Sequence, residues 1–150
     1  MYNTAFRILK DSFEAEDVMQ ESFLTAFTKL GTFKGEVAFG AWLKRIIINK
    51  SITQYRKNNR VSEVGLDVVP EQADKDITET EYTALSVNDI KNSINQLKDN
   101  YRVALTLNLI EGYDYEEIAE IMDITYQNSR TTISRAKSKL RQLLVVSYEG

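Results

Sequence analysis

The sequence changes character sharply after Arg60, and this change limits what the chain can fold into. Residues 1–60 carry ten Lys and Arg against six Asp and Glu, whereas residues 61–90 carry one against eight. The acidic stretch also lacks a sustained hydrophobic period and contains the only proline of the chain. Charge and pattern therefore predict an acidic linker over residues 61–84, with one small domain at 1–60 and another at 85–150.

Both flanking parts have the three- and four-residue hydrophobic spacing that is typical of helices. Four residues stand where they can cap a helix N-terminus: Asp11, Asp99, Asp114 and Thr125. After Asp11, the expected core face of the helix is Ala15, Val18, Met19, Phe23, Ala26, Phe27 and Leu30. After Asp99, residues 101–110 are apolar on most of their circumference, as in a buried helix, and Gly112 is expected to end it. We therefore predict an all-α fold of two small helical domains.

The residue types that are absent narrow the chemistry of the chain. There is no Cys, which excludes disulfides and thiolate metal sites, and there is no His, which removes the commonest general base and metal ligand. We therefore expect no metal, no cofactor and no catalytic site. No apolar stretch is long enough for a membrane span or resembles a signal peptide, so we expect a cytoplasmic protein without membrane insertion.

The segment from Phe33 to Arg60 is rich in aromatic and basic residues. On a helix, its core-facing stripe would be Phe39, Leu43, Ile46 and Ile47. The neighbouring face would carry Trp42, Arg45, Asn49, Thr53 and Arg56. Aromatic, cationic and amide groups of this kind stack on bases, neutralise phosphates and hydrogen-bond base edges. From these residues alone, a solvated basic face around a core tryptophan is an equally good interpretation.

The second domain ends in a pattern that is typical of a helix-turn-helix. A short helix through Ile118 is followed by a tight turn at 123–125 and by a long helix whose inner face is Ser129, Ile133, Ala136, Leu140 and Leu143 or Leu144. The opposite face presents Gln127, Asn128, Arg130, Thr131, Ser134 and Arg135. Amides can read adenine, arginines can read guanine, and hydroxyls and cations can hold phosphates. A basic helix that merely faces solvent is the alternative, and the capped helix and turn before it favour DNA reading.

Several segments resemble those of a known family. In the first domain they are Phe33-Lys34-Gly35-Glu36, Phe39, Ala41-Trp42-Leu43, Arg45-Ile46 and Asn49, and in the second Gly112-Tyr113, Tyr115-Glu116-Glu117-Ile118-Ala119, Ser134-Arg135-Ala136 and Leu140-Arg141. Their order and spacing resemble the promoter-melting and promoter-binding regions of bacterial RNA polymerase sigma factors, in particular the extracytoplasmic function group. The resemblance covers nearly the whole chain except the linker.

The resemblance implies a role for each surface. Residues 15–23 resemble the family's polymerase-binding helix, in which the positions of Asp17, Gln20 and Glu21 face the core enzyme; without that context they would be ordinary solvated acids. The position of Phe33 helps to form the pocket for a base that leaves the melted minus-ten strand. The segment before Lys10 resembles the tail of a longer first helix. The linker resembles one that passes through the channel for nascent RNA.

In the second domain, the family's contacts with the minus-thirty-five element correspond to Arg130, Thr131, Ser134 and Arg135. Ser129 departs from the family, which usually has an apolar residue there, and we expect this to weaken the packing of that turn. The resemblance implies a transcription initiation factor whose partners are core RNA polymerase and promoter DNA. An anti-sigma factor is a further candidate partner.

Two other functions fit the residues. One is a one-component helix-turn-helix regulator, and the other is a helical module that sequesters a partner and has no DNA affinity. A regulator of the first kind normally dimerises, but neither domain has a sustained heptad or an obvious spare apolar face, so we expect the free protein to be a monomer. A sequestering module would not need bases and aromatics in both domains.

Overall fold

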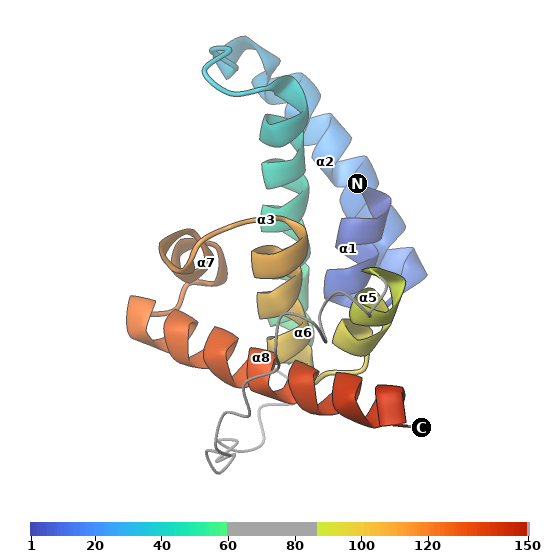
Figure 1. The fold of residues 1–150 in the computed structure, drawn as a ribbon. Coiled ribbons are helices and arrows are strands. Elements are labelled where there is room, and N and C mark those ends of the chain that lie inside the picture. The colour runs from blue at the N-terminus through green and yellow to red at the C-terminus, as the bar shows by residue number, and fades with distance from the viewer. Residues whose placement is uncertain (60–86, 150) are drawn as a thin grey trace. The chain divides into compact units, whose positions relative to one another are not determined.

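The computed structural model describes residues 1–59 and 87–149, with side chains as far as Val145, so the predicted linker lies outside the described residues. Within them every regular element is helical, which confirms the all-α prediction (Figure 1). The chain divides into two compact units, Met1–Gly65 and Leu66–Gly150, and each has its own hydrophobic core. None of the helices in the described ranges combines the length and the apolar character needed to cross a membrane.

The first unit is a three-helix assembly of α1 (Tyr2–Leu9), α2 (Ser12–Lys29) and α3 (Phe39–Asn59). Each helix contacts the other two, and a loop that begins with a 3₁₀ turn joins α2 to α3 (Figure 1). Lys10 adopts a left-handed conformation between α1 and α2, and the side chain of Asp11 accepts a hydrogen bond of 3.0 Å from the Glu14 amide. The predicted cap of α2 is thus present, and it fixes where this helix starts.

The core face of α2 differs from the prediction. Its buried residues are Ala15, Val18, Ser22 and Ala26, whereas Phe23, Phe27 and Leu30 are exposed and Met19 is half-buried. Small side chains let helices approach closely, so α2 packs on α1 and α3 along the small residues. The larger side chains then remain on the outside, where Phe27 is 78% exposed.

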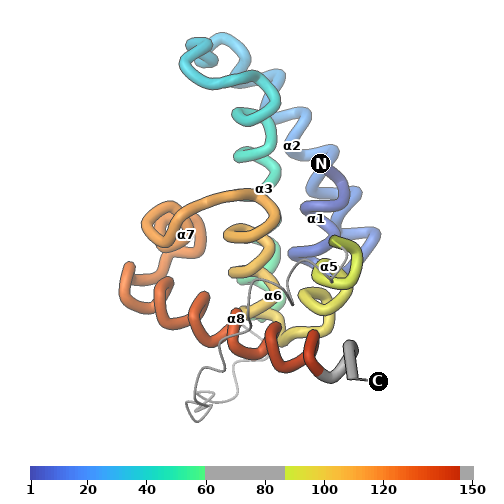
Figure 2. The backbone as a smooth tube through the Cα atoms, viewed as in Figure 1, coloured from blue at the N-terminus to red at the C-terminus, as the bar shows by residue number. Residues whose placement is uncertain are grey.

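The second unit contains α5 (Val87–Asn95), α6 (Asp99–Leu105), α7 (Tyr115–Met122) and α8 (Tyr126–Glu149). The helix α8 packs against α5, α6 and α7. Its buried residues are Ser129, Ile133, Ala136, Leu140 and Leu144, which confirms the predicted inner face. The tube in Figure 2 shows the short connection between α7 and α8, the arrangement expected of a helix-turn-helix.

Local hydrogen bonds mark most of the predicted boundaries in this unit. Asp114 and Glu117 form a complete capping box at the start of α7, and Thr125 Oγ1 accepts from the Asn128 amide at 3.0 Å at the start of α8. Asp123, between the two helices, has φ 54°. The prediction for Asp99 is wrong, because Lys98 precedes α6 and Asp99 is its first residue, where it pairs with Arg102.

The helix α6 continues into a π-helical turn, Thr106–Ile110, instead of ending as a regular α-helix. Leu107 is buried, but Leu109 is exposed, so the predicted burial of the whole segment is wrong at its end. The side chain of Asn108 donates to the Tyr113 carbonyl at 2.9 Å, and the Tyr113 amide donates to the Leu107 carbonyl at 3.0 Å. These bonds brace the connection to α7, in which Gly112 takes a positive φ of 80°.

Candidate nucleic-acid interface

Three aromatic rings gather where the loop after α2 meets the start of α3. The ring centroids of Phe33 and Trp42 are 5.1 Å apart, and that of Phe39 lies 5.7 Å from Phe33 and 5.6 Å from Trp42. Phe39 and Phe33 meet edge to face, at 84° between their planes, which is a favourable arrangement of two rings. The structure thus brings Phe33 and Trp42 together, and it adds a third ring.

Phe39 was expected on the core stripe of α3, and this prediction is wrong. Of that stripe, Leu43 and Ile47 are buried and Ile46 is half-buried, but Phe39 is 48% exposed. The reason is its position at the first residue of α3, beyond the end of α2 at Lys29, where it meets the loop ring of Phe33 instead of a neighbouring helix. A half-open aromatic cluster is a suitable platform for an unpaired base.

The other predicted residues of this surface follow along one side of α3. Asn49 and Thr53 are exposed, and Arg45 and Arg56 are half-buried. The hydroxyl of Thr53 donates to the Asn49 carbonyl at 2.9 Å, so its hydrogen is used within the helix. From Trp42 to Arg56 the surface extends about 21 Å at 1.5 Å per residue, which is enough for several nucleotides of an extended strand. We refer to Phe33, Trp42, Arg45, Asn49, Thr53 and Arg56, with Phe39 added, as the α3 surface.

A polar cluster ties the last turns of α3 to the first turn of α2. Glu14 Oε2 accepts from Asn58 Nδ2 at 2.9 Å, and Glu14 Oε1 accepts from Gln54 Nε2 at 3.4 Å. Gln54 Nε2 also donates to Asn58 Oδ1 at 3.0 Å. One carboxylate thus serves two amides that are four residues apart, and it holds the end of the α3 surface in place.

Replacing Glu14 with alanine should loosen this end of α3. Because a hydrogen bond to a charged group contributes up to about 3 kcal/mol and this cluster is partly open to water, we expect a loss of about 1 kcal/mol in the free energy of unfolding. Chemical denaturation of the full chain measures that loss, and hydrogen exchange should be faster at residues 54–59. Glu16→Ala, which removes an exposed acid from the same helix, is the control. Equal exchange in both variants would contradict a role for the cluster.

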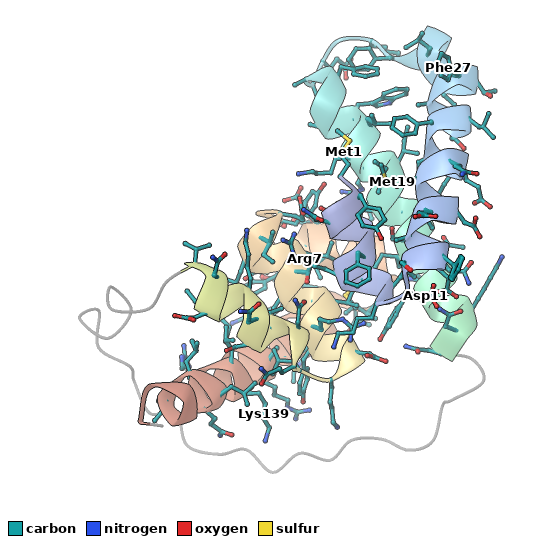
Figure 3. The ribbon with its side chains drawn as sticks, turned by 90° about the vertical axis from the view of Figure 1, so that its right-hand side faces the viewer. Met1, Arg7, Asp11, Met19, Phe27 and Lys139 are labelled. Carbon is teal, nitrogen blue, oxygen red and sulfur yellow. The ribbon has the colours of Figure 1, made fainter. Side chains whose placement is uncertain are left out.

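The outward side of α2 combines acids with large apolar residues. Asp17, Gln20 and Glu21 are exposed, as expected of a docking face. Phe13 and Leu24, which are 80% and 68% exposed, lie on the same side of the helix, as does Phe27. Figure 3 shows Phe27 near the loop end of α2 and Asp11 at its start. We refer to Phe13, Asp17, Gln20, Glu21, Leu24 and Phe27 as the α2 face.

The exposure of the large apolar side chains on the α2 face was not predicted, and the expectation that no spare apolar face exists is wrong for α2. The spacing of small residues in the sequence could have indicated it. Ala15, Ser22 and Ala26 recur at helical spacing and form a stripe of small residues opposite Leu24 and Phe27. Had that stripe been taken as the packed side, the large residues would have been placed outside.

The predicted DNA-reading residues of α8 project away from the core of the second unit. Gln127, Asn128, Arg130, Thr131 and Ser134 are exposed, and Arg135 is half-buried. Ser129, at the turn where we expected weaker packing, contacts the first helix of the motif. It is fully buried and its hydroxyl donates to the Tyr115 carbonyl at 2.7 Å, which joins the two helices of the motif. An apolar residue could not make this bond, so the departure replaces apolar packing with a directional contact.

Across 1–59 and 87–149, no group of three or more carboxylates is placed to hold a metal ion. The α3 surface and the outward residues of α8 present rings, amides, hydroxyls and cations, which are groups that bind nucleic acid, and the α2 face presents acids and large apolar side chains.

Comparison with known proteins assigns the family. Residues 1–61 match the family model of sigma-70 region 2, and residues 88–140 match that of sigma-70, region 4. The RNA polymerase sigma-H factor of Pseudomonas aeruginosa is 35% identical over 92% of this chain and 77% of that protein. The chain belongs to the sigma-70 family. The extracytoplasmic function sigma factor SigW of Bacillus subtilis is 30% identical over 96% of this chain and 82% of that one. This match places the chain in the extracytoplasmic function group.

Two solved structures have a similar fold. The sigma factor RpoE of Bartonella quintana, in complex with the anti-sigma factor NepR, gives a TM-score of 0.61 at 28% identity over 97% of this chain and 89% of that one. CnrH, in complex with the cytosolic domain of CnrY, gives 0.53 at 24% identity over 97% and 80%, and here the likeness concerns the fold alone. As a sigma factor, the protein directs transcription initiation, which decides against the one-component regulator and the sequestering module.

Proposed function

We propose that three surfaces of this sigma factor have separate roles. The α3 surface opens the minus-ten element and holds one strand, the outward residues of α8 bind the minus-thirty-five element as duplex, and the α2 face docks on core polymerase. The observation that carries the proposal is the half-open cluster of Phe33, Phe39 and Trp42, which adjoins the helix that carries Asn49. Stacking on an aromatic ring contributes about 1 to 3 kcal/mol per base, which offsets the few kcal/mol needed to unstack a base.

The experiment that tests this function is run-off transcription with purified core polymerase, with and without the protein. On duplex promoter templates, only the mixture with the protein should initiate at a defined start. The family is one of initiation factors, and we propose that this chain has no catalytic activity of its own. It acts in the cytoplasm, is a monomer when free, and is held inactive by an anti-sigma factor, as RpoE of Bartonella quintana is found with NepR.

Two arginines of α8 provide a test of duplex recognition. If Arg130 or Arg135 reads a base, its change to alanine should cost about 1 to 3 kcal/mol and relax specificity at one position. If it holds a phosphate, binding should weaken across all sequences and the salt slope should fall by about one. Promoter binding titrated at several salt concentrations separates the two cases. Lys139→Ala, farther along the same helix (Figure 3), should leave base specificity unchanged. Unchanged affinity and salt slope in both arginine variants would contradict DNA contact by α8.

A further inference from the structure

Tyr126, the first residue of α8, belongs to none of the three surfaces. It is 51% exposed at the helix end that enters the major groove in a helix-turn-helix. Its ring meets that of Tyr115, the first residue of α7, edge to face, with centroids 6.5 Å apart and planes at 79°. The guanidinium carbon of Arg130 lies 5.9 Å from the centroid of the Tyr126 ring. An aromatic ring therefore stands between the first helix of the motif and the arginine predicted to read DNA.

Two hydrogen bonds fix the backbone around Tyr126. Ser129 donates to the carbonyl of Tyr115, and Thr125 caps α8 immediately before Tyr126. The backbone of half-buried Tyr115 is thus tied to α8, and the Tyr126 ring meets the Tyr115 ring at this contact of the two helices. Tyr126 and Arg130 are four residues apart, so their side chains lie one above the other on the same side of α8.

The ring of Tyr126 restricts the orientation of the Arg130 guanidinium. An exposed arginine samples many rotamers, and it loses that freedom when its planar fork binds a base. A ring beneath the guanidinium favours the orientations in which the group stacks, so less freedom remains to be lost on binding. This restriction should matter most when the guanidinium makes two hydrogen bonds at once, to the O6 and N7 atoms of guanine, because that contact requires one orientation of the group.

We propose that Tyr126 is a specificity-determining positioning residue that holds Arg130 toward a guanine in the upstream promoter element. The inference rests on the proposed function of α8. It predicts that Tyr126 acts through Arg130, so that its contribution to base preference disappears when Arg130 is absent. It also predicts that the ring is required and the phenol hydroxyl is not.

The test uses holoenzyme assembled from the full chain and core polymerase. The probe is a linear promoter library in which only the upstream element is randomised, and sequencing of bound and free duplexes gives the base preference at each position. The variants are Tyr126→Ala, Tyr126→Leu, Tyr126→Phe, Arg130→Ala and the double change of Tyr126 and Arg130 to alanine. Thermal unfolding of each variant checks that the fold is kept, and Tyr126→Leu retains apolar bulk without an aromatic face.

We expect Arg130→Ala to erase a guanine preference at one position. Tyr126→Ala and Tyr126→Leu should reduce that same preference by about two- to fivefold, the range of an exposed cation–π contact, and leave the other positions unchanged. Tyr126→Phe should retain it, and the double variant should match Arg130→Ala.

Other results would overturn the inference. If Tyr126→Ala weakens all library members equally, also without Arg130, Tyr126 contacts the DNA itself. If Arg130→Ala erases a preference that Tyr126→Ala and Tyr126→Leu leave intact, the positioning role is wrong while the proposed function of α8 stands. If Arg130→Ala changes no base preference, the positioning role is wrong. The proposed function of α8 then stands if the variant weakens binding to all library members equally, and it falls if both arginine variants leave affinity and salt slope unchanged.

Discussion

Variants of this sigma factor with Phe33 or Asn49 changed to alanine should assemble with core polymerase and bind duplex promoter, yet open the promoter poorly. Both residues belong to the α3 surface, Phe33 as a ring of the aromatic cluster and Asn49 as an exposed amide. If each holds a base that is available only after melting, its loss should cost about 1 to 3 kcal/mol in the open complex, which is roughly a fivefold to hundredfold reduction. The closed complex should be unaffected, because its bases are still paired.

Permanganate reactivity of thymines in the melted region measures the open complex directly. A template with a pre-melted bubble should restore part of the activity, since the unstacking free energy is then supplied by the template. Asn3→Ala, which removes an exposed amide from α1, is the control for Asn49→Ala. Normal melting in both variants, or failure already at duplex binding, would rule out the single-strand role. Trp42→Ala is a weaker test, because the half-buried ring also supports the domain.

Changing Leu24 or Phe27 to alanine should reduce affinity for core polymerase strongly. Large, exposed apolar side chains beside charged ones are typical anchors of a protein interface, and loss of such an anchor costs about 2 kcal/mol or more, roughly thirtyfold in affinity. The fold should persist, because Leu24 and Phe27 are 68% and 78% exposed and do not contribute to the core. Asp17→Ala and Gln20→Ala, on the same face, should also weaken binding while helicity is unchanged.

Equilibrium binding of labelled protein to core polymerase gives these affinities, and far-UV circular dichroism checks helicity. Leu109→Ala, which removes an exposed apolar side chain from the second unit, is the control. If the Leu24 and Phe27 variants bind core polymerase as tightly as the unchanged chain, the apolar part of the α2 face has another partner.

Local features of the fold could be predicted from the sequence, because their causes lie within a few residues. The capping box of Asp114 with Glu117 needs only a three-residue spacing, and the inner face of α8 follows from one helical period. For the same reason, one side of one helix could be predicted to carry Trp42, Arg45, Asn49, Thr53 and Arg56. The family resemblance then supplied the role of Phe33, which no local pattern contains.

The features that the sequence did not predict depend on contacts between elements that lie apart in the chain. Whether Phe27 or Phe39 is buried depends on which element packs against it. The hydrophobic period of a helix contains no information about that neighbouring element. Weaker packing was predicted at Ser129 because the family usually has an apolar residue there. The hydrogen bond that Ser129 makes could not be foreseen, because its acceptor lies on another helix, fourteen residues earlier in the chain. The edge-to-face contact of Tyr126 with Tyr115 is likewise a contact between helices, so it could not be foreseen from spacing.

The π-helical turn at Thr106–Ile110 has a consequence for how this chain can vary. In a π turn the hydrogen bond reaches back five residues instead of four, so the segment holds one residue more than a regular helix would. Removing Leu109 or Ile110 would let the turn revert to α geometry, so the change would be taken up locally and the residues on either side would keep their helical register. The loss would fall on the hydrogen bond from the Asn108 side chain to the Tyr113 carbonyl, because the spacing of five residues between them would become four. We therefore expect evolution to accept substitutions at exposed Leu109 more readily than its deletion, which would remove this brace.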